Sequence, residues 1–462
     1  MSRTLRLLLV TGMLLLPARA WAHARLKRSE PAAGSSVASA PRVLRFWFSE
    51  RPELSLTVLS LKDASGRSVG LNRAEYDGSD PLAITAGVSD TLAPGRYTVS
   101  WLTAASDGHP THGTFTFVVL EKSPRAETAL EQGIGASADT LRAGNRVAMS
   151  PTRAENSEEA EGASSIANPL ARTFSFLGLL VLVGTAAFAT LIVPRSHGIA
   201  PELAVRVQRD AALIGAVAAL LVIVTAVARL FLESEIMRAM PGMQTMSMAD
   251  MAMHTRWGFA LRLEIGAALL AFVSFALASR RVRGAWLTAA VLAVALAATP
   301  ALAGHAASSP RFTSLLIGCD FLHVLGASAW LGSLFVVMVI GIPRCISLSG
   351  LERWSSVAAL VSSFSPIALA SAGVVVVSGV VASWVHLERA SALWQTAYGQ
   401  VLLVKLFLVA ITLAVGAYNF RRVQPLLSTE AGSARLKRSA VVELGTGFLI
   451  LIVTGFLTGI SP

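Results

Sequence analysis

The sequence contains almost no cysteine: Cys319 and Cys345 are the only two in 462 residues. Both lie in the C-terminal half, so the N-terminal half is not a disulfide scaffold and must fold around its own core. The sequence also lacks a CxxC motif, a Walker phosphate-binding loop and a GxGxxG nucleotide loop. These absences argue against ATP bound within this chain as an energy source.

Charged residues are also scarce, at 15%, whereas hydrophobic residues make up 53% of the chain. The mean hydropathy of +0.60 exceeds that of an ordinary soluble protein. The net charge of +11 does not come from a basic patch with interleaved aromatic residues. The basic residues lie in short loops between apolar runs, where they set the orientation of a membrane protein. We therefore predict a lipid bilayer as a partner and no nucleic acid.

The N-terminus has the pattern of a secretory signal peptide over residues 1–22. Arg3 and Arg6 precede an apolar run from Leu7 to Leu16. Ala20-Trp21-Ala22 then fits a small-x-small cleavage site, and cleavage after Ala22 makes His23 the first mature residue. Ala18-Arg19-Ala20 is a competing site, so the choice between the two stays open.

An N-terminal His23 would chelate a metal ion through its α-amine and its ring Nδ1. Asp107-Gly108-His109 adds a carboxylate and a second imidazole. Two nitrogens from one residue, an imidazole and a carboxylate suit a tetragonal Cu(II) site. In the alternative interpretation, His23 is an ordinary surface histidine near a frayed terminus.

Composition divides the mature chain into three parts. Residues 23–120 are predicted to form an exported all-β domain, a sandwich or a small barrel, because short alternating or apolar runs are bounded by turn residues. The predicted strands are Val43–Phe48, Leu54–Leu59, Tyr97–Leu102 and Thr114–Val119. Residues 121–168, rich in Glu, Ser, Ala, Arg and Gly, are predicted to be a flexible linker.

Residues 169–462 are predicted to form an all-α membrane domain of eight spans, each long enough to cross a hydrocarbon core of about 30 Å. The spans are placed at 170–193, 211–232, 256–278, 285–303, 314–340, 356–382, 398–420 and 440–460. The loops that would be cytoplasmic hold most of the arginines, so the positive-inside rule agrees with the signal peptide. We expect a bacterial inner membrane, with the β-domain in the periplasm. We interpret most tryptophans near span ends, Trp330 among them, as interface anchors.

Seven of the eleven methionines fall within one predicted outer loop. They are Met237, Met240, Met243, Met246, Met248, Met251 and Met253, and His254 follows them. Neutral thioether sulfur is a soft ligand that selects Cu(I). The alternative is an amphipathic Met-rich helix that lies on the membrane or on a partner.

The histidines of the membrane half gather toward the outer side. His254, His305 and His386 are predicted at the outer surface, and His323 lies inside the fifth span. Asp320 precedes His323 by three residues, so both can share one helix face. Ionisable groups within a bilayer are usually functional. We predict an entry path for copper through the methionine segment, His305 and His386 toward Asp320 and His323.

Three stretches of the N-terminal half resemble the CopC family of periplasmic copper-binding proteins. They are His23-Ala-Arg-Leu-Lys-Arg-Ser-Glu-Pro-Ala-Ala-Gly, Ala40-Pro-Arg-Val-Leu-Arg-Phe-Trp-Phe-Ser-Glu and Ser106-Asp-Gly-His-Pro-Thr-His-Gly-Thr-Phe-Thr-Phe. The membrane half is similar to the CopD family at Phe321-Leu-His-Val-Leu-Gly-Ala-Ser-Ala-Trp-Leu-Gly and Tyr398-Gly-Gln-Val-Leu-Leu-Val-Lys-Leu. Together the chain resembles a CopC–CopD fusion of the YcnJ-like kind.

The resemblance implies an Ig-like sandwich with Cu(II) at His23, Asp107 and His109, and His112 as a further candidate ligand. No methionine occurs between Met13 and Met149, so the Met-rich Cu(I) site of some CopC proteins is absent from the β-domain. The resemblance favours copper import over export, although the residues alone leave the direction open.

We expect a transport protein and not an enzyme, with copper as its bound metal and a periplasmic copper chaperone or reductase as a further partner. Two alternatives stay open. One is a membrane haem-type cupric reductase, which needs paired histidines at matching depths. The other is a tethered copper buffer or sensor, in which the helices serve only as an anchor.

Overall fold

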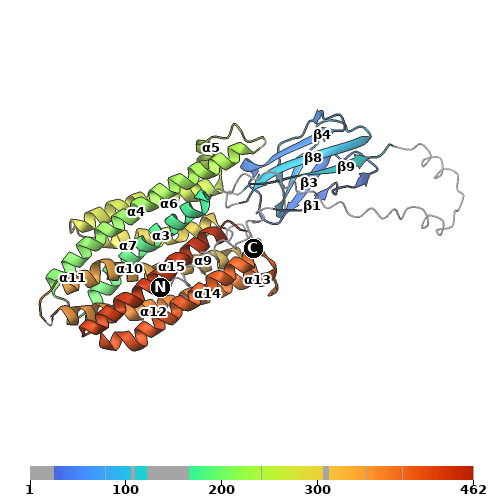
Figure 1. The fold of residues 1–462 in the computed structure, drawn as a ribbon. Helices are drawn as coiled ribbons and strands as arrows, with labels where there is room; N and C mark the ends of the chain where they lie inside the picture. Colours follow the sequence, from blue (N-terminus) through green and yellow to red (C-terminus); the bar gives the residue numbers. More distant parts are fainter. Residues whose placement is uncertain are drawn as a thin grey trace. The chain divides into compact units, whose positions relative to one another are not determined.

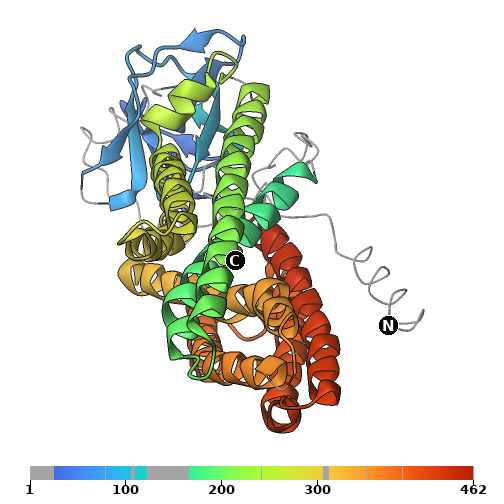
Figure 2. The ribbon, with the colours of Figure 1, turned by 90° about the vertical axis from the view of Figure 1, so that its left-hand side faces the viewer.

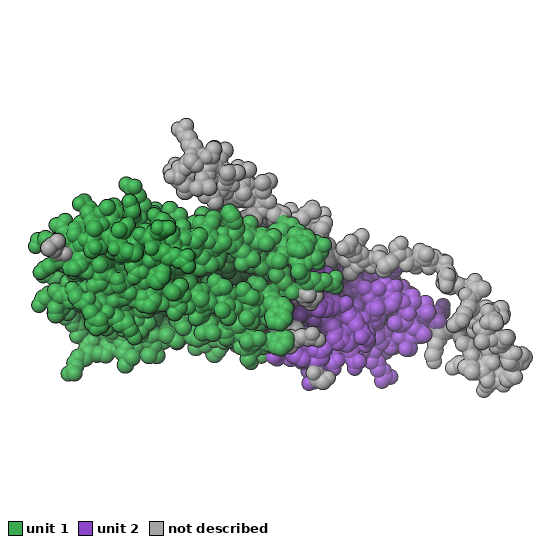
Figure 3. Space-filling view, turned by 90° about the horizontal axis from the view of Figure 1, so that it is seen from below, with its two compact units in different colours: residues 1–22, 163–462 green, residues 23–162 purple. Residues whose placement is uncertain are grey.

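The computed structural model describes residues 25–78, 80–105, 110–121, 166–240, 242–304, 312–350, 352–387 and 389–460. These residues form two compact units, one of strands and one of helices (Figure 3). The predicted signal peptide and most of the predicted linker lie outside the described residues, so the domain boundaries given above stay predictions.

The N-terminal unit is a sandwich of two sheets (Figure 1). One sheet has the order β1 (Leu26–Glu30), β3 (Val43–Phe48), β7 (Asp80–Gly87) and β6 (Glu75–Asp77). The other has the order β2 (Ser36–Val37), β9 (Pro110–Val119), β8 (Gly95–Ala104), β4 (Val58–Asp63) and β5 (Ser68–Val69). All pairs are antiparallel except β2 with β9. Of the two predicted architectures, the structure therefore has the sandwich.

Aromatic side chains from both sheets fill the space between them. In β3, Leu44, Phe46 and Phe48 alternate with more exposed residues and point inward. Phe46 lies edge-to-face against Phe115 of β9, with ring centroids 6.2 Å apart. Phe48 meets Trp101 of β8 in the same way at 5.4 Å. The alternation of period two thus supplies a core that needs no disulfide.

One predicted strand begins later than expected. The segment Leu54–Leu56 is a single 3₁₀ turn, called η1, and β4 starts only at Val58. The Thr57 hydroxyl donates to the carbonyl of Glu53 at 2.8 Å, which closes the turn. Leu56 still reaches the core, so burial of that leucine does not require a strand at this position.

Among its described residues, the C-terminal unit contains eight helices or helix stacks long and apolar enough to cross a membrane, the number predicted from the sequence. In chain order, the first four comprise α3 (Ala167–Ala187) with η2 (Phe188–Ile192) and η3 (Val193–Arg195), α4 (Pro201–Ala239), α6 (Arg256–Ser279) and α7 (Ala285–Ala303). The fifth comprises α9 (Thr313–Ala327), η4 (Ser328–Gly332), α10 (Ser333–Val336), η5 (Val337–Gly341) and α11 (Ile342–Ile346). The last three comprise α12 (Glu352–His386), α14 (Ala397–Tyr418) with η6 (Asn419–Val423) and η7 (Gln424–Leu426), and α15 (Glu430–Leu457). Two short helices, α5 (Met248–His254) and α13 (Ala392–Gln395), lie between spans. The long helices run side by side (Figures 1 and 2).

Four segments within these spans are π-helical: η2, η4, η5 and η6. A π-helical turn contains an extra residue, is rare, and occurs most often at functional sites. Two of the four are important below, because η4 carries Trp330 and η6 begins at Asn419.

The helices α3 and η4 cross with their backbones in direct contact. A Cβ atom added to Gly332 would lie 2.0 Å from the carbonyl oxygen of Leu180, and one added to Gly184 would lie 2.2 Å from the carbonyl carbon of Gly332. No side chain fits there, and glycine at a crossing lets two membrane helices approach closely. This crossing fixes η4, and with it Trp330, against the first span.

Candidate metal centres

The predicted Cu(II) ligands His23, Asp107 and His109 lie outside the described residues. The described residues that flank them come from one end of the sandwich. Leu26, at the start of β1, pairs with Phe48, whose ring contacts Trp101. Trp101 lies three residues before Ala104, the last residue of β8. The segment that holds Asp107 and His109 follows directly after this strand.

The strand pair β8–β9 has a fixed register beside that segment. Trp101 pairs with Gly113, and a Cβ atom on Gly113 would lie 2.8 Å from the indole ring. Only glycine therefore lets the indole lie across β9 at this point. Ala104 pairs with Pro110, so both ends of the segment 105–110 are held by the ladder. His112 pairs with Leu102 and is half-buried on the face of β9 opposite to Thr111 and Gly113.

The methionine segment is largely structured and not an open loop. Met237 belongs to α4, and Met248, Met251 and Met253 belong to α5. Met237, Met243 and Met251 are buried, with exposed fractions of 1%, 6% and 0%. Met248 and Met253 are exposed, at 41% and 57%, whereas Met240 and Met246 are half-buried. Packing therefore accounts for three of the seven methionines, and the other four are the accessible thioethers.

The short helix α5 is held in place at both of its ends. Ser247 and Asp250 form a capping box at its start. The Ser247 hydroxyl and backbone N–H, together with nearby His254, lower the pKa of the Asp250 carboxyl, so Asp250 is ionised at neutral pH. At the other end a Cβ atom on Gly258 would lie 2.3 Å from the Met251 carbonyl oxygen, so glycine is needed where α5 turns into α6. The position of the methionines is thus set by local structure.

One accessible thioether already has a partner. Arg262 of α6 donates to the sulfur of Met253 across 3.0 Å. Arg262 and Glu264 are two residues apart, and residues at that spacing do not face each other on a helix, so at most a loose pairing between them is expected. The structure pairs Glu264 with Arg229 of α4 instead, at 3.2 Å, as expected if buried charges pair between helices.

Three helices bring the predicted transport residues of the fifth span together with a lysine. His323 of α9 lies 3.2 Å from the hydroxyl of Ser378 in α12. Lys405 of α14 is close enough to both Asp320 and His323 for their charges to interact. A Cβ atom on Gly379 would lie 3.3 Å from the imidazole, so α12 approaches closely here. We call Asp320, His323, Ser378 and Lys405 the outer polar cluster.

The remaining path residues are less fully placed. His305 lies outside the described residues, and of His386 only the backbone, at the end of α12, is described. His254 is exposed at the end of α5. Within the described part of the chain, no three His, Cys, Asp or Glu side chains converge as a set that could hold a metal ion.

Sequence reasoning missed two features of this region. Ser378 is a serine in an apolar helix and gives no periodic pattern. Trp330, which we interpreted as an interface anchor, is instead buried at 6% exposure and donates to Glu443 across 2.9 Å. Its position in the middle of the fifth span was the available indication, because interface anchors lie at span ends.

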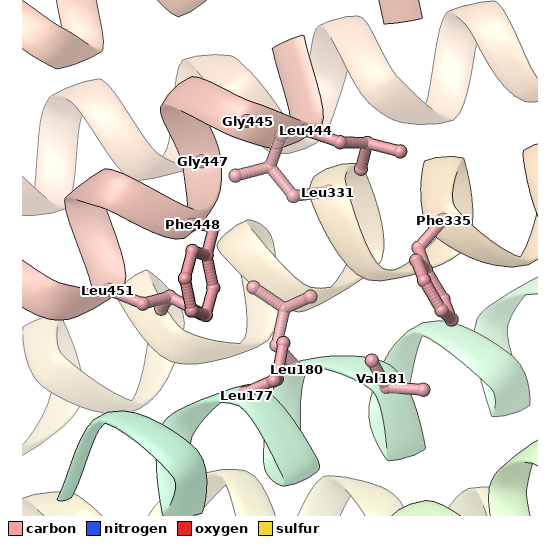
Figure 4. A pocket seen from close by; sticks show the side chains of 10 residues that line it. All are labelled: Leu177, Leu180, Val181, Leu331, Phe335, Leu444, Gly445, Gly447, Phe448 and Leu451. Carbon is pink, nitrogen blue, oxygen red and sulfur yellow. The ribbon is translucent and has the colours of Figure 1, made fainter. Parts of the chain in front are cut away.

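A cavity of about 370 Å³ lies between α3, the η4–α10 stretch and α15 (Figure 4). Its walls contain only leucine, valine, phenylalanine and glycine: Leu177, Leu180, Val181, Leu331, Phe335, Leu444, Gly445, Gly447, Phe448 and Leu451. These side chains offer no ligand to a cation, so the cavity does not belong to a copper path.

Three family models match the chain, in an order that follows the two units. The CopC domain matches residues 26–120, the N-terminal domain of copper resistance protein D-like proteins matches 163–310, and copper resistance protein D matches 358–457. The chain thus combines domains of the copper transport and resistance families, with a CopC domain in the β-sandwich unit and CopD domains in the helical unit.

The chain is also similar to individual proteins. The copper transport protein CutJ of Bacillus subtilis is 24% identical over 99% of this chain and 77% of its own length. The protein YobA of Escherichia coli is 33% identical over 26% of this chain and 96% of its own length. PcoC, a methionine-rich copper resistance protein from Escherichia coli with a known crystal structure, is 32% identical in sequence. The match covers 21% of this chain and 99% of that chain and has a TM-score of 0.20. The chain belongs to the CopC–CopD fusion family.

Proposed function

We propose that the protein captures Cu(II) in the periplasm and moves copper inward across the bacterial inner membrane. The observation that carries this proposal is the fusion of a CopC domain to a CopD domain within one chain. The accessible methionines and the outer polar cluster provide further support, because thioether sulfur is a soft ligand that selects Cu(I) and because polar groups inside a membrane helix are usually functional. The proposed role is transport and not catalysis.

Capture is assigned to His23, Asp107 and His109, with His112 as a further candidate ligand. The start of β1 and the end of β8 share one end of the sandwich, as the Leu26–Phe48 pair and the Phe48–Trp101 contact require. A free N-terminal amine on His23 would complete a set of nitrogen and oxygen ligands suited to Cu(II).

An extra N-terminal alanine tests the capture site. We expect residues 23–121 with His23 as the free N-terminus to bind one Cu(II). The same domain with one alanine before His23 should bind at least about 100-fold more weakly, because loss of a direct ligand exceeds the 10–100-fold typical of outer-shell changes. Titration and electron paramagnetic resonance measure both effects. Equal affinity and equal spectra for the two forms would show that the amine is not a ligand.

Transfer to the membrane domain is assigned to the four accessible methionines, Met240, Met246, Met248 and Met253. Thioethers prefer Cu(I), so each Cu(II) must gain one electron before or during transfer. We assign that electron to a periplasmic reductase, whereas a periplasmic copper chaperone would exchange the ion without changing its charge. The predicted linker raises the local concentration of the β-domain near this segment.

Separate substitution of the accessible and buried methionines tests the transfer step. Leucine at Met240, Met246, Met248 and Met253 should reduce copper accumulation in cells to the level without the protein, because four soft ligands are lost. Leucine at buried Met237, Met243 and Met251 conserves volume, costs less than about 1.5 kcal/mol per site, and should leave accumulation intact. Elemental analysis of washed cells measures both. Normal accumulation in the first variant, with the protein present in the membrane, would rule out this route.

Passage through the bilayer is assigned to the outer polar cluster. Lys405 and Asp320 carry opposite charges within one cluster, which lowers the energy of both inside the membrane. A Cu(I) ion that reaches His323 would bring a second positive charge close to that of Lys405. The cluster would therefore act as a site of exchange and not as a permanent metal site.

A further inference from the structure

Glu443 is a buried acid in the middle of α15 whose partners are neutral. Trp330 Nε1 donates to its Oε1 across 2.9 Å, and Asn419 Nδ2 donates to its Oε2 across 2.9 Å. Glu443 is 3% exposed, and a Cβ atom on Gly416 of α14 would lie 3.5 Å from its Oε1. Both donors belong to π-helical segments, η4 and η6. We call Glu443, Trp330 and Asn419 the inner polar cluster.

Glu443 differs from the other buried acids of the described helices in having no cationic partner. Glu233 pairs with Arg172 and Glu264 pairs with Arg229, each at 3.2 Å. No described lysine, arginine or histidine lies within ion-pair distance of Glu443. The titratable or charged residues on the elements packed against α15 are Arg172 on α3, Lys405, Tyr398 and Tyr418 on α14, Arg421 and Arg422 on η6, and Glu352, Arg353 and His386 on α12. An ionised carboxylate without a countercharge is expensive inside a membrane, so Glu443 needs a cation to neutralise it.

The groups around Glu443 suit a proton better than a metal ion. Only three side-chain oxygens are present in the cluster, the two of Glu443 and Oδ1 of Asn419, whereas hard metal ions take six or more ligands. A proton requires one oxygen. Oδ1 of Asn419 is buried and has no hydrogen-bond partner in the described structure.

Asn419 can serve both protonation states of Glu443. An amide has a donor end and an acceptor end, so its NH₂ group can donate to the carboxylate, and its oxygen, after the amide turns over, can accept from the carboxylic acid. The indole N–H of Trp330 can donate in either state. The cluster therefore has partners for Glu443 with and without a proton, and this is what a site of proton exchange requires.

Polar side chains recur on one face of the seventh span between the two clusters. Lys405, Thr412 and Asn419 are spaced seven residues apart, which places them on one helix face. The hydroxyl of Thr412 donates to that of Thr446 on α15 across 2.9 Å, and Thr446 is one turn from Glu443. On the fifth span Trp330 follows His323 by seven residues. The same two spans thus carry both clusters. Along the fifth span, and along α14 and η6, the residues of the inner polar cluster follow those of the outer polar cluster.

We propose that Glu443 is a proton-binding site of the membrane domain and that a proton enters through it together with copper. A proton from periplasmic water forms one O–H bond on the carboxylate of Glu443, and that bond breaks when the proton leaves to cytoplasmic water. No electron moves in this step. The coupling to copper rests on the proposed function, whereas proton binding by Glu443 does not.

Infrared difference spectroscopy tests proton binding directly, with the full chain in lipid nanodiscs and no copper present. A pH change should alter the C=O stretching band of a protonated carboxylic acid, and Glu443→Gln should remove that band. The glutamine side chain keeps the shape and an acceptor for Trp330, so the variant should still fold. Glu235→Gln is the control and should keep the band, because Glu235 is an exposed acid of α4 that pairs with Arg238. A band unchanged in Glu443→Gln would overturn the proposal.

Copper uptake by proteoliposomes tests the coupling. The measured quantity is the ratio of the copper concentration inside the proteoliposomes to that outside. If one proton enters with each copper ion, an acidic exterior should raise this ratio by up to about tenfold for each unit of pH difference. Glu443→Gln should accumulate copper to a ratio that does not depend on the pH difference. A variant that responds as the wild type does would overturn the coupling. If the wild type moves no copper while the infrared band depends on Glu443, the proposed function fails and the proton site stands.

Discussion

Replacement of Gly332 with alanine is expected to prevent the membrane domain from reaching its folded state. The new methyl group would lie 2.0 Å from the Leu180 carbonyl oxygen, far inside van der Waals contact, and the obstructing atom belongs to a backbone that cannot rotate away. The helices α3 and η4 would have to separate, which also removes Trp330 from Glu443. We expect the free energy of unfolding to fall by about 4–5 kcal/mol or more, which is at the upper end of the range for single substitutions.

Gly318 provides the control for this substitution. It lies in α9 of the same span, and a Cβ atom there would have nothing within 4 Å. Because the added methyl group would meet no neighbouring atom, Gly318→Ala should change the free energy of unfolding by no more than about 0.5 kcal/mol. Size-exclusion chromatography of detergent-solubilised protein after graded heating measures both variants. Equal retention of monodisperse protein by the two would contradict the close crossing.

Removal of Arg229 alone is expected to be the second most damaging change. Its guanidinium donates to Glu264 across 3.2 Å and to the Ser175 hydroxyl across 3.4 Å, and the Ser175 hydroxyl donates to Glu264 across 3.3 Å. The side chains of Arg229 and Glu264 are 17% and 7% exposed. Arg229→Met would leave the carboxylate buried without a countercharge, at a cost of about 3–5 kcal/mol.

The double variant Arg229→Met with Glu264→Leu separates the ion pair from simple packing. Because both charges disappear together, the double variant should recover most of the stability lost by Arg229→Met. Thermal unfolding in the same detergent, followed by tryptophan fluorescence, compares wild type, both single variants and the double variant. A double variant less stable than Arg229→Met would show that the two residues do not act as a pair.

Local patterns predicted the elements of this fold well, because a strand or a membrane helix follows from the period and length of its apolar residues. The predicted strand Val43–Phe48 coincides with β3, and each predicted span falls on one long helix or helix stack. The segment after Met237 was predicted as a loop, yet Met248–His254 is helical, since the capping box of Ser247 and Asp250 starts a helix there. Short-range capping was visible in the sequence, but burial of Met251 was not.

Contacts between helices could not be predicted from the sequence. Glu443 was evident as a charge in an apolar run, but nothing in its neighbourhood indicated Trp330, 113 residues away, or Asn419, 24 residues away. The same holds for Ser378 beside His323, which lies 55 residues away. Such partners are determined by how the spans pack against one another. The spacing of residues within one span does not show which residues of another span it will contact. The Cu(II) ligands remain predictions of the sequence, because they lie outside the described residues.

The length of α4 determines where copper would be received. No charged residue occurs between Asp210 and Arg229, a stretch of 18 residues, which at 1.5 Å per residue is about 27 Å and close to the thickness of the hydrocarbon layer. Ten further residues carry the helix from Arg229 to Ala239, a rise of about 15 Å. That rise exceeds the depth of the lipid headgroups on one side of a bilayer. The accessible thioethers beyond α4, those of Met240, Met246, Met248 and Met253, would therefore lie past the headgroup layer, where a soluble copper donor could reach them without competition from lipid phosphates.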